Sequence, residues 1–114
     1  MYGKTLKVYG EDLYKAGTSG VVNAGGTMGS LVVNLVAIAD TSSFAATTVT
    51  VKQGTEVDNV TKACGSFTSV QKENVKAGDV IATYSPAFDV ETFLTATVEG
   101  ETTNARVTLG YLPR

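Results

Sequence analysis

The residue types that could carry out chemistry are scarce in this chain of 114 residues, and histidine is absent. Without histidine, a serine–histidine catalytic pair and a metal site built from histidine and cysteine clusters are both excluded. Cys64 is the single cysteine, so no disulfide can form within the chain. Because no histidine can activate its thiol, we interpret Cys64 as a small, buried hydrophobic side chain.

Carboxylates gather in the last third of the chain, where a pair could serve a glycosidase or several could hold calcium. They are Asp79, Asp89, Glu91, Glu99 and Glu101. These residues flank turns and strand ends, and the Asp-x-Asp-x-Asp-Gly pattern of a calcium loop is missing. We therefore interpret them as solvated turn residues, and we expect no enzyme activity, no catalytic residue, no metal site and no cofactor.

Residues 16–30 are rich in glycine, which could indicate a loop that cradles phosphate. Such a loop precedes a helix and usually a lysine, whereas this one leads into a run of β-branched residues. We interpret it as an arm or a crossover between strands. Tyrosine can support sugar binding or a protein contact, and the candidates are Tyr2, Tyr9, Tyr14 and Tyr111.

Composition and charge narrow the class of protein further. Hydrophobic residues make up 43% of the chain and charged residues 18%, which is typical of a folded protein rather than a disordered one. The net charge of −2 gives no electrostatic reason to expect nucleic acid or an anionic membrane as a partner. No signal peptide or membrane-spanning stretch is recognisable, so we expect synthesis in a cytoplasm.

The elements that must position these residues are strands, because threonine and valine recur between glycine breaks. We predict an all-β fold: one antiparallel β-sandwich domain over residues 1–114, jelly-roll-like, with about six to eight strands. Residues 1–30 are either an arm or an extended loop of that domain. The runs 92–98 and 105–112 alternate around a short polar loop, which predicts a hairpin. Residues 71–75 are a candidate helical turn.

Several residues between the clear strands are candidates for core contacts. They are Phe44, Val57, Val60, Cys64 and Phe67.

Leu31 to Ala39 is an apolar run that only Asn34 interrupts, so this strand offers apolar side chains to both faces. A strand with one wet face should alternate. The second face is covered either by the N-terminal region with Val57 to Phe67, or by another subunit. The candidate partner-interface residues are Val32, Val36, Ile38, Tyr9 and Tyr111.

The order of these elements resembles a known family. It consists of a glycine- and threonine-rich region, the long apolar strand, the strand Thr47–Lys52, a turn at Lys76–Asp79 and the closing pair of strands. Over about residues 28–112 this resembles the small jelly-roll cement, or decoration, proteins of short-tailed bacteriophage capsids. That family has no diagnostic motif whose residues could be carried over to this chain.

The resemblance implies a non-enzymatic structural protein of the virion. Such proteins bind the outside of the capsid, stabilise contacts between major capsid protein subunits and associate, typically as dimers. The implied partners are thus the major capsid protein and a second copy of the chain, with no nucleic acid or membrane. The alternatives are another virion appendage, such as a tail or fibre domain, and a carbohydrate-binding module.

Overall fold

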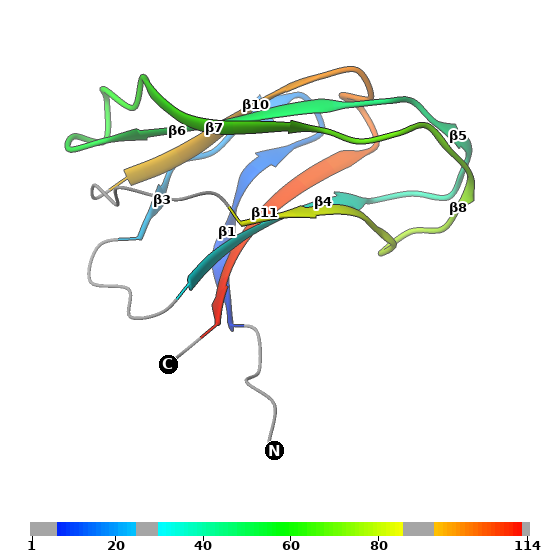
Figure 1. Ribbon diagram of the computed structural model, residues 1–114, viewed down its shortest axis with the longest axis horizontal. Coiled ribbons are helices and arrows are strands. Elements are labelled where there is room, and N and C mark those ends of the chain that lie inside the picture. Colours follow the sequence, from blue (N-terminus) through cyan, green and yellow to red (C-terminus); the bar gives the residue numbers. More distant parts are fainter. Residues whose placement is uncertain (1–6, 25–29, 86–92, 113–114) are drawn as a thin grey trace.

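The computed structural model describes residues 7–24, 30–85 and 93–112, apart from the side chains of residues 7–11, 30–31 and 111–112. Within these ranges every regular element is a strand and every pairing is antiparallel. Two sheets form the layers, with β6, β7 and β10 in one and β1, β4 and β11 in the other (Figure 1). The prediction of an all-β antiparallel sandwich is confirmed.

The first sheet has the strand order β2-β1-β11-β4-β9. Its strands are β1 (Lys7–Lys15), β2 (Thr18–Ser19), β4 (Ser30–Ala37), β9 (Val80–Tyr84) and β11 (Ala105–Leu112). The second sheet has the order β3-β10-β6-β7. Its strands are β3 (Val22–Asn23), β6 (Thr48–Gly54), β7 (Lys62–Thr68) and β10 (Phe93–Glu99).

A separate ribbon of two strands, β5 (Thr41–Phe44) and β8 (Lys72–Val75), lies at one end of the sandwich (Figure 1). The candidate helical turn at residues 71–75 is therefore wrong, since most of that segment is β8. The described residues form eleven strands rather than six to eight, because several strands of two to four residues leave no alternation in the sequence.

The core lies between the two sheets and follows from alternation. On β4 the inward residues Val33, Leu35 and Ala37 are buried, and they share one hydrophobic cluster with Val49 and Val51 of β6. The other members of that cluster come from both sheets and from the ribbon: Leu13, Tyr14, Val22, Ala24, Phe44, Val75, Ile81, Leu94, Ala96, Ala105, Val107 and Leu109.

The expected core contacts between the clear strands were partly right. Phe44 is fully buried, and Cys64 and Phe67 pack against the cluster as partly buried side chains. Val57 was expected in the core but is 59% exposed. It lies in the turn between β6 and β7, where alternation no longer indicates which side chains point inward.

The predicted hairpin between residues 92–98 and 105–112 is wrong. β10 pairs with β6 and β3 in the second sheet, whereas β11 pairs with β4 and β1 in the first. The segment between them crosses from one sheet to the other. At Gly100 the backbone has φ +118°, and the Glu101 N–H donates to Oγ1 of the buried Thr47 at 3.1 Å.

The described part of the N-terminal region, residues 7–24, lies in strands. β1 pairs along β11, and the short β2 and β3 continue from it to the edges of the two sheets. Side chains tie this passage to β10: the Ser19 hydroxyl donates to Ala96 O at 3.0 Å, and the Thr95 hydroxyl donates to Gly20 O at 2.6 Å.

Candidate partner-binding surface

The outward face of the first sheet is organised as rows that run across its strands. Neighbouring strands are in register, so residues that pair across the sheet and point outward form continuous lines. Because Val33 and Leu35 point into the core, Val32, Asn34 and Val36 point to the other face of β4. This is the second face of the apolar run from Leu31 to Ala39.

One line, here called the polar row, consists of Thr83, Asn34, Thr108 and Asp12, which are neighbours in register on β9, β4, β11 and β1. The Thr83 hydroxyl donates to Asn34 Oδ1 at 2.9 Å. Asn34 and Thr108 are only 8% and 7% exposed. Asn34, the single polar residue of the apolar run, therefore holds a hydrogen bond across the outer face.

The next line, here called the mixed row, consists of Val80, Val36, Arg106 and Lys15 on the same four strands. Its β9 end is apolar and its β1 end is basic. Val80 is 54% exposed, Val36 and Arg106 are partly exposed and Lys15 is exposed. Apolar and cationic groups thus meet in one line at the surface.

A hollow of about 390 Å³ lies beside the mixed row. It is lined by Lys15, Val36, Ala37, Ile38, Gly78 and Arg106. Backbone hydrogen bonds fix its walls, since Gly78 N–H donates to Ala37 O at 2.8 Å and Ile38 N–H donates to Asn104 O at 3.0 Å. The hollow is therefore a fixed part of the surface, held where β4 ends and β11 begins.

The guanidinium of Arg106 is bound through one of its three nitrogens. Its Nε donates to Oδ1 of Asp12 at 2.5 Å, and the two side chains are 41% and 20% exposed. Its two terminal nitrogens donate to no side chain or backbone oxygen of the described residues. The Lys15 ammonium likewise forms no ion pair within the described part of the chain.

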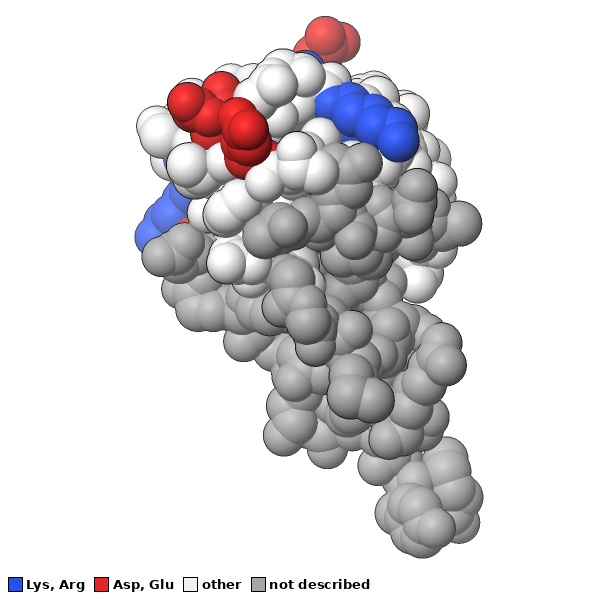
Figure 2. Space-filling view, turned by 90° about the vertical axis from the view of Figure 1, so that its left-hand side faces the viewer, with Lys and Arg blue, Asp and Glu red and all other residues white. Residues whose placement is uncertain are grey.

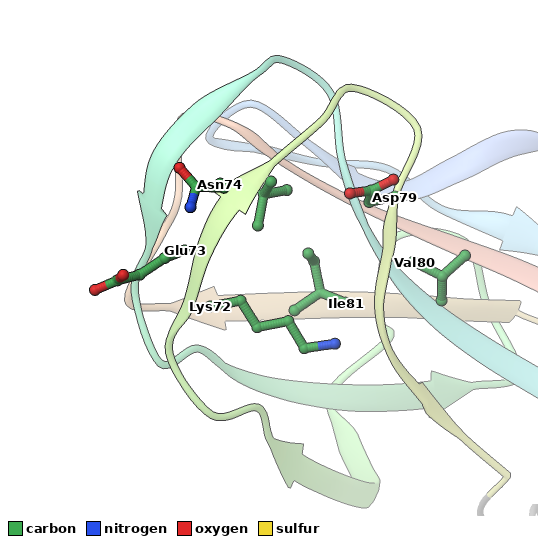
Figure 3. A pocket seen from close by; sticks show the side chains of 7 residues that line it. Lys72, Glu73, Asn74, Asp79, Val80 and Ile81 are labelled. Atoms are coloured by element: carbon green, nitrogen blue, oxygen red, sulfur yellow. The ribbon is translucent and has the colours of Figure 1, made fainter.

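A smaller depression of about 210 Å³ lies between β8 and β9 (Figure 3). Lys72 runs along Ile81 in this depression, whereas Glu73 points to the opposite side of β8 (Figure 3). The turn that joins the two strands is held by Asp79, whose Oδ2 accepts from Lys76 N–H at 3.0 Å. Alternation on β8 separates the charged side chains, so they do not converge on one ligand position.

Of the five residues expected at a partner interface, the structure describes the side chains of three. Val36 and Ile38 line the same hollow. Val32 lies on the same outer face but is only 8% exposed, so it offers little contact area. Tyr9 and Tyr111 belong to the adjacent strands β1 and β11, and their side chains lie outside the described part. The structure thus brings Val36 and Ile38 together.

From the sequence, the second face of the apolar run could be covered either by the N-terminal region with Val57 to Phe67 or by another subunit. β7, which contains the end of the Val57 to Phe67 segment, belongs to the second sheet and faces the inner side of β4. It therefore does not cover Val36. Sequence reasoning also missed Arg106, Lys15 and Asp12. The signal for Arg106 was available, since it is a lone charge in an otherwise alternating strand.

Two of the carboxylates weighed for catalysis take part in turns. Glu101 Oε1 accepts from Asn104 N–H at 3.1 Å and so acts as a turn residue, as does Asp79. Asp89 and Glu91 fall outside the described residues. Cys64 donates through Sγ to Val51 O at 3.4 Å, and burial raises the pKa of its thiol.

Within residues 7–24, 30–85 and 93–112, no group of three or more cysteine, aspartate or glutamate side chains is placed to hold a metal ion. No helix in those ranges is long and apolar enough to cross a membrane. Figure 2 views one end of the sandwich, where described acidic side chains gather on one side and a basic side chain lies on the other. The sequence matches no family model and no curated protein, and the structure matches no solved structure.

Proposed function

We propose that this protein is a non-enzymatic structural component of a bacteriophage virion that binds the outside of the capsid. In this role it stabilises contacts between major capsid protein subunits, after synthesis in the host cytoplasm, and associates with a second copy of itself as a dimer. The observation that carries the proposal is the mixed row, where Val36 and Val80 leave apolar surface exposed on the outer face of the first sheet. Exposed apolar patches often mark protein contacts.

The strand order supports the jelly-roll part of this proposal. A jelly roll has eight strands in two four-stranded sheets, connected as two Greek keys. Without the short β2 and the β5–β8 ribbon, the described strands form the sheets β1-β11-β4-β9 and β3-β10-β6-β7. The chain crosses between these sheets at most steps, which is how a jelly roll closes its sandwich.

The sheet edges favour a contact through the face rather than through an added strand. β2 and β3 are edge strands of two residues each. β7 and β9, the opposite edges, each carry an extra residue that interrupts the register, Cys64 in one and Ile81 in the other. Short and bulged edges resist pairing with a further strand. A partner is therefore better accommodated on the outer face.

A surface with few contacting groups suits a protein that binds many equivalent sites on a capsid lattice. A few exposed aliphatic side chains and one cationic pair give a modest affinity for a single contact. A protein that binds many equivalent sites, and that is itself dimeric, gains avidity because the second contact forms at high effective concentration. Such a protein can stabilise a shell without a large interface per copy.

The experiment that tests the function is cosedimentation with capsids that lack this protein. We expect the wild-type protein to bind and to migrate as a dimer in light scattering. Val36→Lys should abolish binding and leave the circular dichroism spectrum unchanged, because Val36 is partly exposed. Val33→Lys is the matched control, since Val33 is fully buried and an unpaired charge there should unfold the protein. A monomer that binds no capsid would contradict the proposal.

The alternatives receive less support from the described residues. A carbohydrate-binding module would present a row of exposed tyrosines, but Tyr14 is buried with its hydroxyl donating to Thr102 O at 3.2 Å. Tyr84 packs against Phe67. A tail or fibre domain would place the protein at the tail, which labelled electron microscopy of virions distinguishes from the capsid surface.

A further inference from the structure

The hollow beside the mixed row combines aliphatic and cationic side chains. Val36 and Ile38 supply an aliphatic floor, and Lys15 and Arg106 supply positive charge beside it. Both cations have unused donors among the described residues, namely the Lys15 ammonium and the two terminal nitrogens of Arg106. A ligand can therefore gain hydrogen bonds here without displacing any that the protein already makes.

The charges that face the hollow leave it positive. Asp12 neutralises part of Arg106 through their ion pair, but Lys15 remains uncompensated. Asp79 follows Gly78 in the chain but lines the depression between β8 and β9 instead, where its Oδ2 accepts from Lys76 N–H. The lining residues together with Asp12 therefore carry a charge of about one positive unit, which favours an anion even though the chain as a whole carries −2.

The aliphatic floor limits which anion fits. A carboxylate on an aliphatic stem matches both parts, since its oxygens accept from the ammonium and guanidinium while its methylene groups cover Val36 and Ile38. A guanidinium with two free terminal nitrogens is suited to a carboxylate in particular. A phosphate would leave the floor exposed and would lose hydration beside it.

We propose that this hollow binds an acidic side chain, with its flanking aliphatic residues, from a surface segment of the partner protein. The proposal rests on the capsid-binding function proposed above and specifies its chemistry: the complementary segment of the major capsid protein carries a glutamate or aspartate next to aliphatic residues. Lys15 and Arg106 hold the carboxylate, and Val36 and Ile38 hold the aliphatic part. The occupant is thus the capsid protein rather than the second copy of this chain.

The test compares variants of the full chain in cosedimentation with capsids that lack this protein. Lys15→Gln removes a charge that takes part in no ion pair among the described residues, so the fold should be unaffected. We expect its dissociation constant to rise at least tenfold and its dependence on salt to weaken, with binding restored in Lys15→Arg. Lys52→Gln is the matched control, because Lys52 lies on β6 in the other sheet and loses the same charge.

Two results would overturn the inference, and they differ in what they say of the function. If wild-type protein binds capsids and Lys15→Gln binds as tightly as Lys52→Gln, the carboxylate hollow is wrong and the capsid function stands. If wild-type protein does not bind capsids at all, the function fails and the inference fails with it. A loss in Lys15→Gln that Lys15→Arg restores, with Lys52→Gln unchanged, supports both.

Discussion

The rings of Phe67 and Tyr84 pack with their centroids 5.1 Å apart and their planes inclined by 36°, although the two residues belong to different sheets. Phe67 lies on β7 and Tyr84 on β9, which are the edge strands on the same side of the sandwich. This contact therefore closes one open side of the core. Phe67 also packs against the hydrophobic cluster as a partly buried side chain.

Truncating this contact should destabilise the protein and reveal coupling between the sheets. We expect Phe67→Ala to lower the free energy of unfolding by about 2–3 kcal/mol, since the side chain is only partly buried. A double-mutant cycle with Tyr84→Ala, followed by urea unfolding, should give a coupling energy of about 0.5–1.5 kcal/mol. Strict additivity of the two truncations would show that the rings do not interact.

Gly100 is required by the crossing from β10 to β11. Its φ of +118° disfavours any side chain, and a Cβ there would meet Ala46 O. We expect Gly100→Ala to cost about 3 kcal/mol of unfolding free energy. Gly17→Ala is the matched control, because its φ is +89° but a Cβ there meets nothing within 4 Å. It should cost only about 1 kcal/mol; equal losses in thermal unfolding would remove the packing explanation.

Thr47 stabilises the same crossing between β10 and β11 through its side chain. Its hydroxyl accepts from Glu101 N–H and donates to Ala45 O, and the residue is fully buried. We expect Thr47→Val to cost about 1–3 kcal/mol, since the Glu101 N–H and the Ala45 carbonyl both lose the partner that the buried Thr47 hydroxyl gives them. Thr48→Val should cost under about 0.5 kcal/mol, because its hydroxyl pairs with Thr68 in an exposed position. Chemical denaturation of both variants makes the comparison.

Cys64 should make stability depend on pH in the alkaline range. Burial raises the pKa of its thiol above the ordinary value of 9.0, so the unfolded chain loses this proton at lower pH than the folded protein. The contribution of Cys64 to stability is thus constant below about pH 9 and falls as the pH rises toward the folded pKa. Urea unfolding from pH 7 to 10 should show a steeper decline for wild type than for Cys64→Ala. Parallel curves would contradict this.

The fold class followed from alternation, and so did much of the core. Alternation places Val49 and Val51, or Leu94 and Ala96, on one face because they are two residues apart, and all four are buried. Alternation states which face of a strand is buried but not which strand lies beside it. The closing strands at 92–98 and 105–112 therefore suggested a hairpin, whereas their partners are far away in the sequence.

The candidate surface was predicted only in part for the same reason. The apolar run identified Val36 and Ile38, because its second face had no obvious cover. Lys15 and Arg106 are 91 positions apart in the chain and become neighbours only through the β1–β11 register. Such a pair is invisible before the topology is known, since a lone lysine or arginine on a strand is ordinarily a solvated side chain.

The pairing of β1 with β11 bears on how the chain acquires its structure during synthesis. Lys7 is the register partner of Tyr111, so the first sheet stays incomplete until β11 has left the ribosome. β11 is also the neighbour of β4, which means that both β1 and β4 wait for their shared central strand. Long-range pairing of this kind slows folding. The apolar strand β4 therefore lacks its neighbour in the sheet until β11 has been synthesised.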